Sequence, residues 1–102
     1  MITTHQLSNM LPEIPPDSII SRTIFSDEKI TAVLFGFAPG SELSEHTSAK
    51  PAVLQFLSGE ADVTLGGESL EGAPGAWVHM PPNTPHSIKA RTNVSMLLLL
   101  LG

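Results

Sequence analysis

Cysteine and tyrosine are both absent from this chain of 102 residues. Without cysteine there is no disulfide, no thiolate metal site and no cysteine nucleophile. No serine occupies a Gly-x-Ser-x-Gly turn of the kind that exposes a hydrolase nucleophile, and no glycine-rich loop opens a helix to hold a nucleotide phosphate. The four histidines are therefore the side chains best suited to bind a metal or to transfer protons near neutral pH.

Basic residues and long apolar runs are scarce as well. Five Lys and Arg oppose ten Asp and Glu, and the net charge is −5. No basic face is available, so we expect neither nucleic acid nor an anionic membrane as a partner. The longest apolar run, 96–101, is too short to span a bilayer, and the N-terminal residues do not resemble a secretory signal. We therefore expect a cytoplasmic protein.

The length and the apolar content together indicate one domain. A chain of this size buries roughly two-thirds of its unfolded surface. With 41% hydrophobic and 15% charged residues, there is enough apolar material for one core. Residues 1–18 are expected to form an extended arm, because prolines at 12, 15 and 16 exclude a helix there. Residues 19–102 form the predicted domain.

Short extended segments fill the rest of the chain, with glycine or proline about every ten residues. This pattern favours a single all-β domain, either a sandwich or a closed barrel. Gly66-Gly67 is a strong signal for a two-residue hairpin turn. The leucine-rich run 96–101 follows a series of strands, which favours a final strand over a helix. The strands are predicted at 19–25, 30–37, 52–57, 61–65, 69–71, 76–80, 86–90 and 94–101.

Several of these strands are apolar on both faces, and residues 53–57 are the clearest case. A strand exposed on one side would alternate, so both sides of such a strand should be covered. A second subunit is one possible cover and a second sheet is the other. We expect a homodimer formed by contact between sheets and by exchange of the N-terminal arm, which would also hide edge strands.

Two spaced motifs link the histidines to a known family. Gly40, His46 and Gly59 form the first, and Gly75, Pro81 and His86 form the second. Together with the segments FLSGEADVTLGG and MPPNTPH, they resemble the two motifs of the cupin superfamily, in particular short bacterial single-domain cupins. The resemblance covers about residues 35–101. It implies a jelly-roll, or double-stranded β-helix, barrel that often carries a divalent metal ion at its mouth.

The residues at the family's ligand positions differ from the usual set. The first motif normally supplies two histidines and then Glu, Gln or His, and these positions are His46, Ser48 and Ala52 in this chain. The second motif supplies His86. Of the four expected ligands, His46 and His86 remain, and two imidazoles alone bind a divalent metal weakly. Water, a bound substrate, Glu42, Glu45 or His79 are open as further ligands, although no spacing requires any of them. Asn83 stands where the family usually has glycine, and asparagine tolerates a positive φ.

The resemblance also implies a ligand pocket. Leu54 and Phe56 share the face of residue 52 and would line the cavity with His46, Ser48 and His86, while Gln55 should point away. Such a pocket suits a small molecule that is mostly apolar or carries a carboxylate. A packing role is favoured over a ligand role for His79, although the strand register that decides which way it points stays open. His5 is expected to have no role. Most of the aromatic residues Trp77, Phe35, Phe37 and Phe56 should belong to the core.

Three functions remain open from the sequence. The first is a small-molecule-binding barrel with an incomplete metal site and no assignable reaction. The second is a metal-dependent isomerase, lyase or dioxygenase that uses His46 and His86 on a small carboxylate or diketone. The third is an interaction module whose sheet pairs with a larger protein and which would show an exposed apolar patch. The fold alone does not choose among them.

Overall fold

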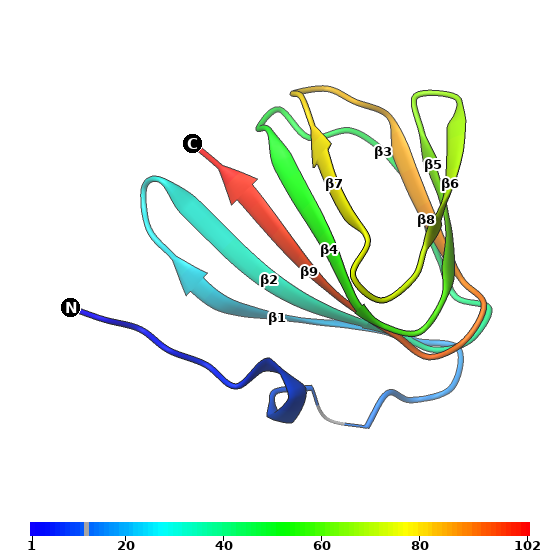
Figure 1. Ribbon diagram of the computed structural model, residues 1–102, viewed down its shortest axis with the longest axis horizontal. Coiled ribbons are helices and arrows are strands. Elements are labelled where there is room, and N and C mark those ends of the chain that lie inside the picture. The colour runs from blue at the N-terminus through cyan, green and yellow to red at the C-terminus, as the bar shows by residue number, and fades with distance from the viewer. Residues whose placement is uncertain (12) are drawn as a thin grey trace.

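The computed structural model describes residues 1–11 and 13–102, and its regular secondary structure is almost entirely β (Figure 1). A 3₁₀ turn, η1 (Leu7–Asn9), precedes the strands. The strands are β1 (Ile19–Ser26), β2 (Ile30–Phe37), β3 (Glu42–His46), β4 (Ala52–Ser58), β5 (Ala61–Leu65), β6 (Glu68–Gly72), β7 (Trp77–Met80), β8 (His86–Ala90) and β9 (Val94–Leu101).

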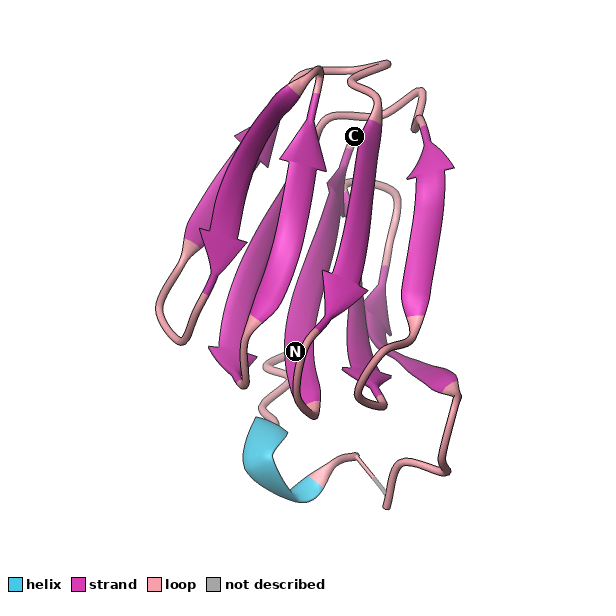
Figure 2. Cartoon of the chain, turned by 90° about the vertical axis from the view of Figure 1, so that its right-hand side faces the viewer, coloured by secondary structure: helices cyan, strands magenta, loops and turns pink. Residues whose placement is uncertain are grey.

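These strands form two antiparallel sheets that enclose a single core (Figure 2). The larger sheet has the order β1-β2-β9-β4-β7, and the smaller has the order β3-β8-β5-β6. Strands β4 and β9 therefore lie in the larger sheet, whereas their sequence neighbours β3, β5 and β8 lie in the smaller one. This arrangement confirms the predicted all-β jelly-roll fold of one domain.

Turn residues set the strand boundaries as the sequence predicts. Gly66 and Gly67 have φ values of 53° and 92° and join β5 to β6, as expected for a hairpin turn that needs positive φ at both central positions. Asn83 has a φ of 64°, which confirms that asparagine preserves the turn where the family has glycine. One strand, β3, was not predicted. Its segment Glu42–His46 has a single apolar residue and lies at the edge of the smaller sheet.

The core lies between the two sheets and includes two fully buried aromatic rings, Phe37 and Phe56. Phe56 packs directly over Gly72 of the opposite sheet, because a Cβ at that glycine would lie 2.7 Å from the ring. Phe35 is half-buried and contacts the core. The expectation that most of Trp77, Phe35, Phe37 and Phe56 are in the core is thus confirmed, with Trp77 as the exception at 62% exposure, and Phe25 on β1 is exposed as well.

The leucine-rich segment forms β9, the middle strand of the larger sheet. It pairs with β2 on one side and with β4 on the other. Leu97 to Leu101 are nevertheless only half-buried. In the part of the chain that the structure describes, no helix is long and apolar enough to cross a membrane.

The N-terminal arm, residues 1–18, lies against the larger sheet of its own chain (Figure 1). Ile14 contacts Gly36 so closely that a Cβ there would meet it at 3.0 Å. Arg22 donates a hydrogen bond to the carbonyl oxygen of Met10, at 3.2 Å. The described part of the arm contains the 3₁₀ turn η1 and a turn at residues 16–17, where Asp17 has a φ of 58°. Pro12 lies outside the described residues.

Candidate ligand and metal site

An irregularity in β3 brings His46 opposite His86. Leu43 pairs with Ile88 and His46 pairs with His86, so three steps on β3 match two steps on β8. In regular pairing, His46 would lie on the face opposite to Leu43. The extra residue reverses this alternation and places His46 on the same side as His86, which is how bulges often direct side chains in binding sites.

The two imidazole rings are close neighbours. Their centroids are 4.1 Å apart, and their planes are inclined by 54°. His86 is buried at 6% exposure, whereas His46 is exposed. The pair therefore lies at the edge of the core, with one ring against apolar side chains and the other in contact with solvent.

Hydrogen bonds show which ring nitrogen carries the hydrogen in both neutral imidazoles. Nδ1 of His46 lies 2.8 Å from the carbonyl oxygen of Ser44, and Nδ1 of His86 lies 2.9 Å from that of Thr84. A carbonyl oxygen can only accept, so each Nδ1 carries a hydrogen and donates it. In the neutral rings, each Nε2 then has a free lone pair that can bind a metal or accept a hydrogen bond.

Ser48 connects the two motif loops. Its carbonyl oxygen accepts a hydrogen bond of 2.7 Å from the backbone N–H of Asn83. Its hydroxyl oxygen accepts one of 3.2 Å from the backbone N–H of Lys50. The backbone of Ser48 thus holds the loop after His46 against the loop before His86, and the two histidines come from tied segments.

Ala52, Leu54 and Phe56 point into the space between the sheets, with exposures of 2%, 1% and 0%. Gln55, between them, is exposed, as the alternation predicts. Leu54 and Phe56 belong to the packed core cluster. They form apolar filling between the two sheets, while His46 and His86 lie where this packing meets solvent.

The donor set does not complete a metal site of the expected kind. Among the described residues, no three side chains of His, Cys, Asp or Glu are grouped so that they could hold a metal ion. His46 and His86 present two nitrogen donors, and the third and fourth positions are a serine that binds backbone and a buried methyl group. A divalent ion here would depend on water or a bound molecule for its remaining ligands.

The other two histidines lie away from this pair. Val78 and Met80 face the core, so His79 between them points outward, and it is exposed. The expectation that it is a packing residue is therefore wrong, because the register of β7 places it on the outer side. Nε2 of His5 lies 2.7 Å from the carbonyl oxygen of Ile24 and holds the arm to β1.

A charged cluster lies on the outer side of the smaller sheet. Arg91 forms an ion pair with Glu71 and lies 3.5 Å from Asp62 and 3.8 Å from Glu60. The hydrogen bond from Arg91, followed by its positive charge, lowers the pKa of Glu71 below the ordinary value of 4.5. The hydrogen bond with Glu71 raises the pKa of Arg91 in turn. This cluster links β5, β6 and the end of β8, and its members are exposed.

The contacts of the histidine pair were not visible in the sequence. The motifs indicated that His46 and His86 belong to one site, but no residue pattern signals the extra residue in β3. The carbonyl groups of Ser44 and Thr84 also escaped prediction, because every residue has a backbone carbonyl and only the folded register selects these two.

Comparison with known proteins identifies relatives of this architecture. Residues 33–102 match the family model described as Cupin domain. No curated protein sequence matches the chain. A conserved protein of unknown function from Streptococcus pyogenes is similar in structure, with a TM-score of 0.85 and 28% identity over 99% of this chain and 88% of that one.

Two further structures share the fold. An RmlC-like cupin protein from Desulfovibrio desulfuricans has a TM-score of 0.87 and 22% identity, over 99% of this chain and 97% of that one. A DMSP lyase from Ruegeria pomeroyi has a TM-score of 0.76 and 20% identity, over 82% of this chain and 47% of that one. Similar structures thus have different or unknown functions, and they assign no specific reaction.

Proposed function

Because this chain belongs to the cupin family, we propose that its barrel binds a small molecule where His46 and His86 meet. The observation that carries this proposal is the pair of imidazoles, 4.1 Å apart, whose Nδ1 atoms are both occupied by backbone carbonyls. Two free Nε2 atoms at the edge of an apolar core can orient one polar group of a ligand. The rest of that ligand would contact apolar side chains.

The ligand that suits this site is small and mostly apolar, with a carboxylate or another polar group at one end. Ala52, Leu54 and Phe56 are packed inside the core, so a ligand would contact only the edge of this apolar interior, beside His46 and His86. A neutral imidazole accepts a hydrogen bond through Nε2, and a protonated one donates to a carboxylate. We propose Ser48 as part of the pocket rim, because its backbone joins the two loops that carry the histidines.

A second candidate is a metal-dependent enzyme that uses His46 and His86 as its protein ligands. The hydrogen bonds from Nδ1 to Ser44 and Thr84 favour it, because a metal-bound histidine commonly donates its other N–H to an acceptor in this way. A divalent ion would supply Lewis-acid chemistry to a small carboxylate or diketone, as in an isomerase, lyase or dioxygenase. The incomplete donor set places this candidate second.

We further propose that the protein acts in the cytoplasm as a homodimer. The acidic composition supports the absence of nucleic acid and anionic membrane partners. Leu97, Leu99 and Leu101 of β9 are half-buried and face away from the core, which supports a second subunit as their cover.

Elemental analysis of protein purified without a chelator or an immobilised-metal column separates the two candidates. We expect less than about one-tenth of an equivalent of iron, manganese, nickel or zinc, because two imidazoles hold a divalent ion weakly. Near-stoichiometric metal that is lost in His46→Ala would instead establish the enzyme candidate. The exposed His79 provides a matched control, since His79→Ala should change nothing at the site.

Binding of small carboxylates is then measured by calorimetry on the same proteins. We expect His46→Ala to weaken binding about tenfold or more with the fold intact, because one charged or polar contact is lost. Equal affinities for the wild-type protein, His46→Ala and His79→Ala would contradict the ligand site. Ser48→His with Ala52→Glu restores the family pattern, and strong metal uptake only in that double variant would show that the native donor set is what limits affinity.

A further inference from the structure

The outer face of the larger sheet, meaning the side turned away from the core, is apolar and lacks formal charge over three strands. Core contacts of Val94, Met96, Val78 and Met80 fix the alternation of β9 and β7, and those of Leu54 and Phe56 fix that of β4. The outward positions are Val53, Gln55, Leu57, Trp77, His79, Ser95, Leu97, Leu99 and Leu101. None of them is Asp, Glu, Lys or Arg, although the chain has five basic and ten acidic residues.

The outward side of the smaller sheet has the opposite character. Asp62 is paired with Lys89 on one side and with Glu71 on the other, and Arg91 binds two of these carboxylates. Two copies that faced each other across this mixed charged surface would have to bury ionised groups, with like charges among them. The outer face of the larger sheet is where two copies can approach without placing like charges together.

Trp77 projects from this outer face. It begins the edge strand β7, lies opposite Gln55, and is 62% exposed. An indole ring offers a large apolar area and one N–H that needs an acceptor, which is why tryptophan is enriched at the centres of protein interfaces. No charged residue adjoins it on the outward positions of β4.

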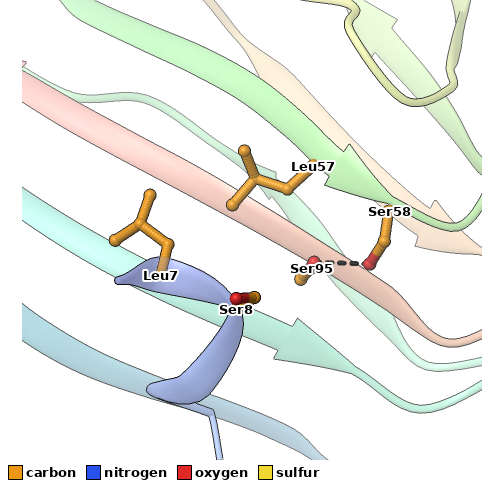
Figure 3. Close-up of a pocket in the computed structure, with 5 residues that line it drawn as sticks. All are labelled: Leu7, Ser8, Leu57, Ser58 and Ser95. Atoms are coloured by element: carbon orange, nitrogen blue, oxygen red, sulfur yellow. Dashed lines mark hydrogen bonds between the residues drawn. The ribbon is translucent and has the colours of Figure 1, made fainter. Parts of the chain in front are cut away.

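A hollow of about 350 Å³ opens on the same face (Figure 3). Leu7 and Ser8 of η1 form one wall, and Leu57, Ser58 and Ser95 form the other. The hydroxyl groups of Ser58 and Ser95 lie 2.5 Å apart and share one hydrogen bond. One hydroxyl donates this bond and the other accepts it, so each oxygen keeps a lone pair that can accept a further hydrogen bond. The hollow therefore combines apolar walls with free hydrogen-bond acceptors. Those are the features that an indole ring requires.

Trp77 and the hollow are neighbours on one surface. Leu57, which lines the hollow, is two residues along β4 from Gln55, the partner of Trp77. Such diagonal neighbours in a sheet are about 7–8 Å apart. A two-fold axis that runs in the plane of the face, between Trp77 and the hollow, places the projection of each copy opposite the hollow of the other. This is the self-complementarity that an isologous interface requires.

We propose that two copies of this chain associate through the outer face of the larger sheet, with Trp77 of each copy inserted into the hollow of the other. The inference rests on the homodimer of the proposed function and names its surface. The N-terminal arm stays on its own sheet and supplies one wall of the hollow, in place of the arm exchange that the sequence suggested. The partner is thus a second copy of this chain, and each hollow is filled only by the other copy's indole.

Trp77 is the single tryptophan of the sequence, so its fluorescence reports directly on this contact. We would measure emission and acrylamide quenching together with sedimentation from about 1 µM to about 500 µM protein. The expected result is a blue shift and weaker quenching that follow the monomer–dimer transition. A dimer in which Trp77 stays fully quenchable, or a monomer at every concentration, would overturn the inference.

Two variants test the two halves of the contact separately. Trp77→Ala removes the projection, and Ser58→Leu narrows the hollow while Trp77 remains available as a probe. Both should weaken dimerisation at least tenfold, as for the removal of a central interface residue. Ser69→Ala, at an exposed and uncharged position on β6 of the smaller sheet, is the control and should not change it. Circular dichroism verifies that each variant is folded.

The outcomes separate this inference from the proposed function. A dimer that is unaffected by both variants keeps the homodimer and rejects this surface. A monomer rejects the homodimer and the surface together, whereas the effect of His46→Ala on carboxylate binding still tests the ligand site. Weakening by both variants, with Trp77 exposed to quencher in Ser58→Leu, supports the inference.

Discussion

At the scale of single residues, Gly59 occupies a position that no other residue type can take without rearrangement. Its φ is 79°, and a Cβ there would lie 1.9 Å from the carbonyl oxygen of Asn93. The turn between β4 and β5 therefore depends on glycine twice, once for its backbone angle and once for the close approach of the loop before β9. This explains in physical terms why the first motif ends in glycine.

We predict that Gly59→Ala destabilises the fold by about 2–5 kcal/mol, from the combined cost of a strained φ and of displacing backbone atoms. Gly75→Ala is a matched control, because Gly75 has a φ of 91° with no atom within 4 Å of the added Cβ. It should cost about 1–2 kcal/mol, from the backbone angle alone. Urea denaturation measures the free energy of unfolding of both variants. Equal losses would show that the contact with Asn93 does not contribute to the cost at Gly59.

Glu71 gives a pH-dependent prediction. Because Arg91 lowers its pKa below 4.5 in the folded state, the charged form stabilises the fold above the unfolded-state pKa. This contribution is lost as pH falls through the lowered value. Glu71→Gln should therefore be less stable than wild type at neutral pH, and the difference should vanish well below pH 4.5. Urea melts across that range test this, and a difference that persists in strong acid would contradict it.

At the scale of elements, strand β6 packs closely against the core at Gly72, because this residue has no side chain. Gly72 lies under the ring of Phe56, so these two residues determine how closely β6 approaches β4. Glycine in a strand often marks such a close approach. The distance between the two sheets at this point is therefore set by the contact between the ring of Phe56 and the backbone of Gly72.

We predict that Gly72→Ala destabilises the fold by about 1–3 kcal/mol through overpacking. The smaller side chain in Phe56→Leu should relieve part of this cost, so the double variant should be more stable than the sum of the two single losses indicates. A double-mutant cycle by thermal or urea denaturation measures the coupling. Strict additivity would mean that β6 moves away freely and that the ring does not set the spacing.

The elements also show what the sequence was able to predict. Eight of the strands follow from short apolar or alternating segments bounded by glycine, proline or polar turn residues, and these signals act within a few residues. Strand β3 escaped because its partner β8, forty residues away, rather than its own composition, makes Glu42–His46 extended. The same register places His46 beside His86. Pairs of motifs can indicate that two histidines share a site, but only the pairing of strands decides how their rings meet.

Exposure is the other property that local patterns did not predict. Trp77 and His79 lie in a short apolar segment that reads as core, yet Val78 and Met80 between and after them take the inward positions. A shift of one residue would reverse all four side chains. The sequence therefore predicted the strand and the fold class, whereas the direction of these side chains came from the pairing of β7 with β4.

At the scale of the whole molecule, charge and apolar surface are separated onto different sides. The outer side of the smaller sheet has Asp62, Glu71, Lys89 and Arg91, and the outer face of the larger sheet has leucines and Trp77. With a net charge of −5 on each copy, long-range repulsion opposes association while the apolar contact favours it.

We therefore predict that added salt strengthens dimerisation, by about three- to tenfold between low and physiological ionic strength, because screening reduces the repulsion. Sedimentation at several sodium chloride concentrations measures the dissociation constant. An interface held by ion pairs would weaken with salt instead, and that result would contradict an uncharged contact surface. Lys89→Glu increases the net negative charge away from the interface and should make the salt dependence steeper.

The place of β9 in the larger sheet has a consequence for the order in which the protein is assembled during synthesis. Strands β3, β5, β6 and β8 have all left the ribosome once residue 90 is free, so the smaller sheet can form early. The hairpin of β1 and β2 and the pair β4 and β7 remain separate until residues 94–101 emerge and join them. A nascent chain that pauses before this segment holds two halves of a sheet with unpaired inner edges, and β9, which follows the other eight strands along the chain, closes the gap between them.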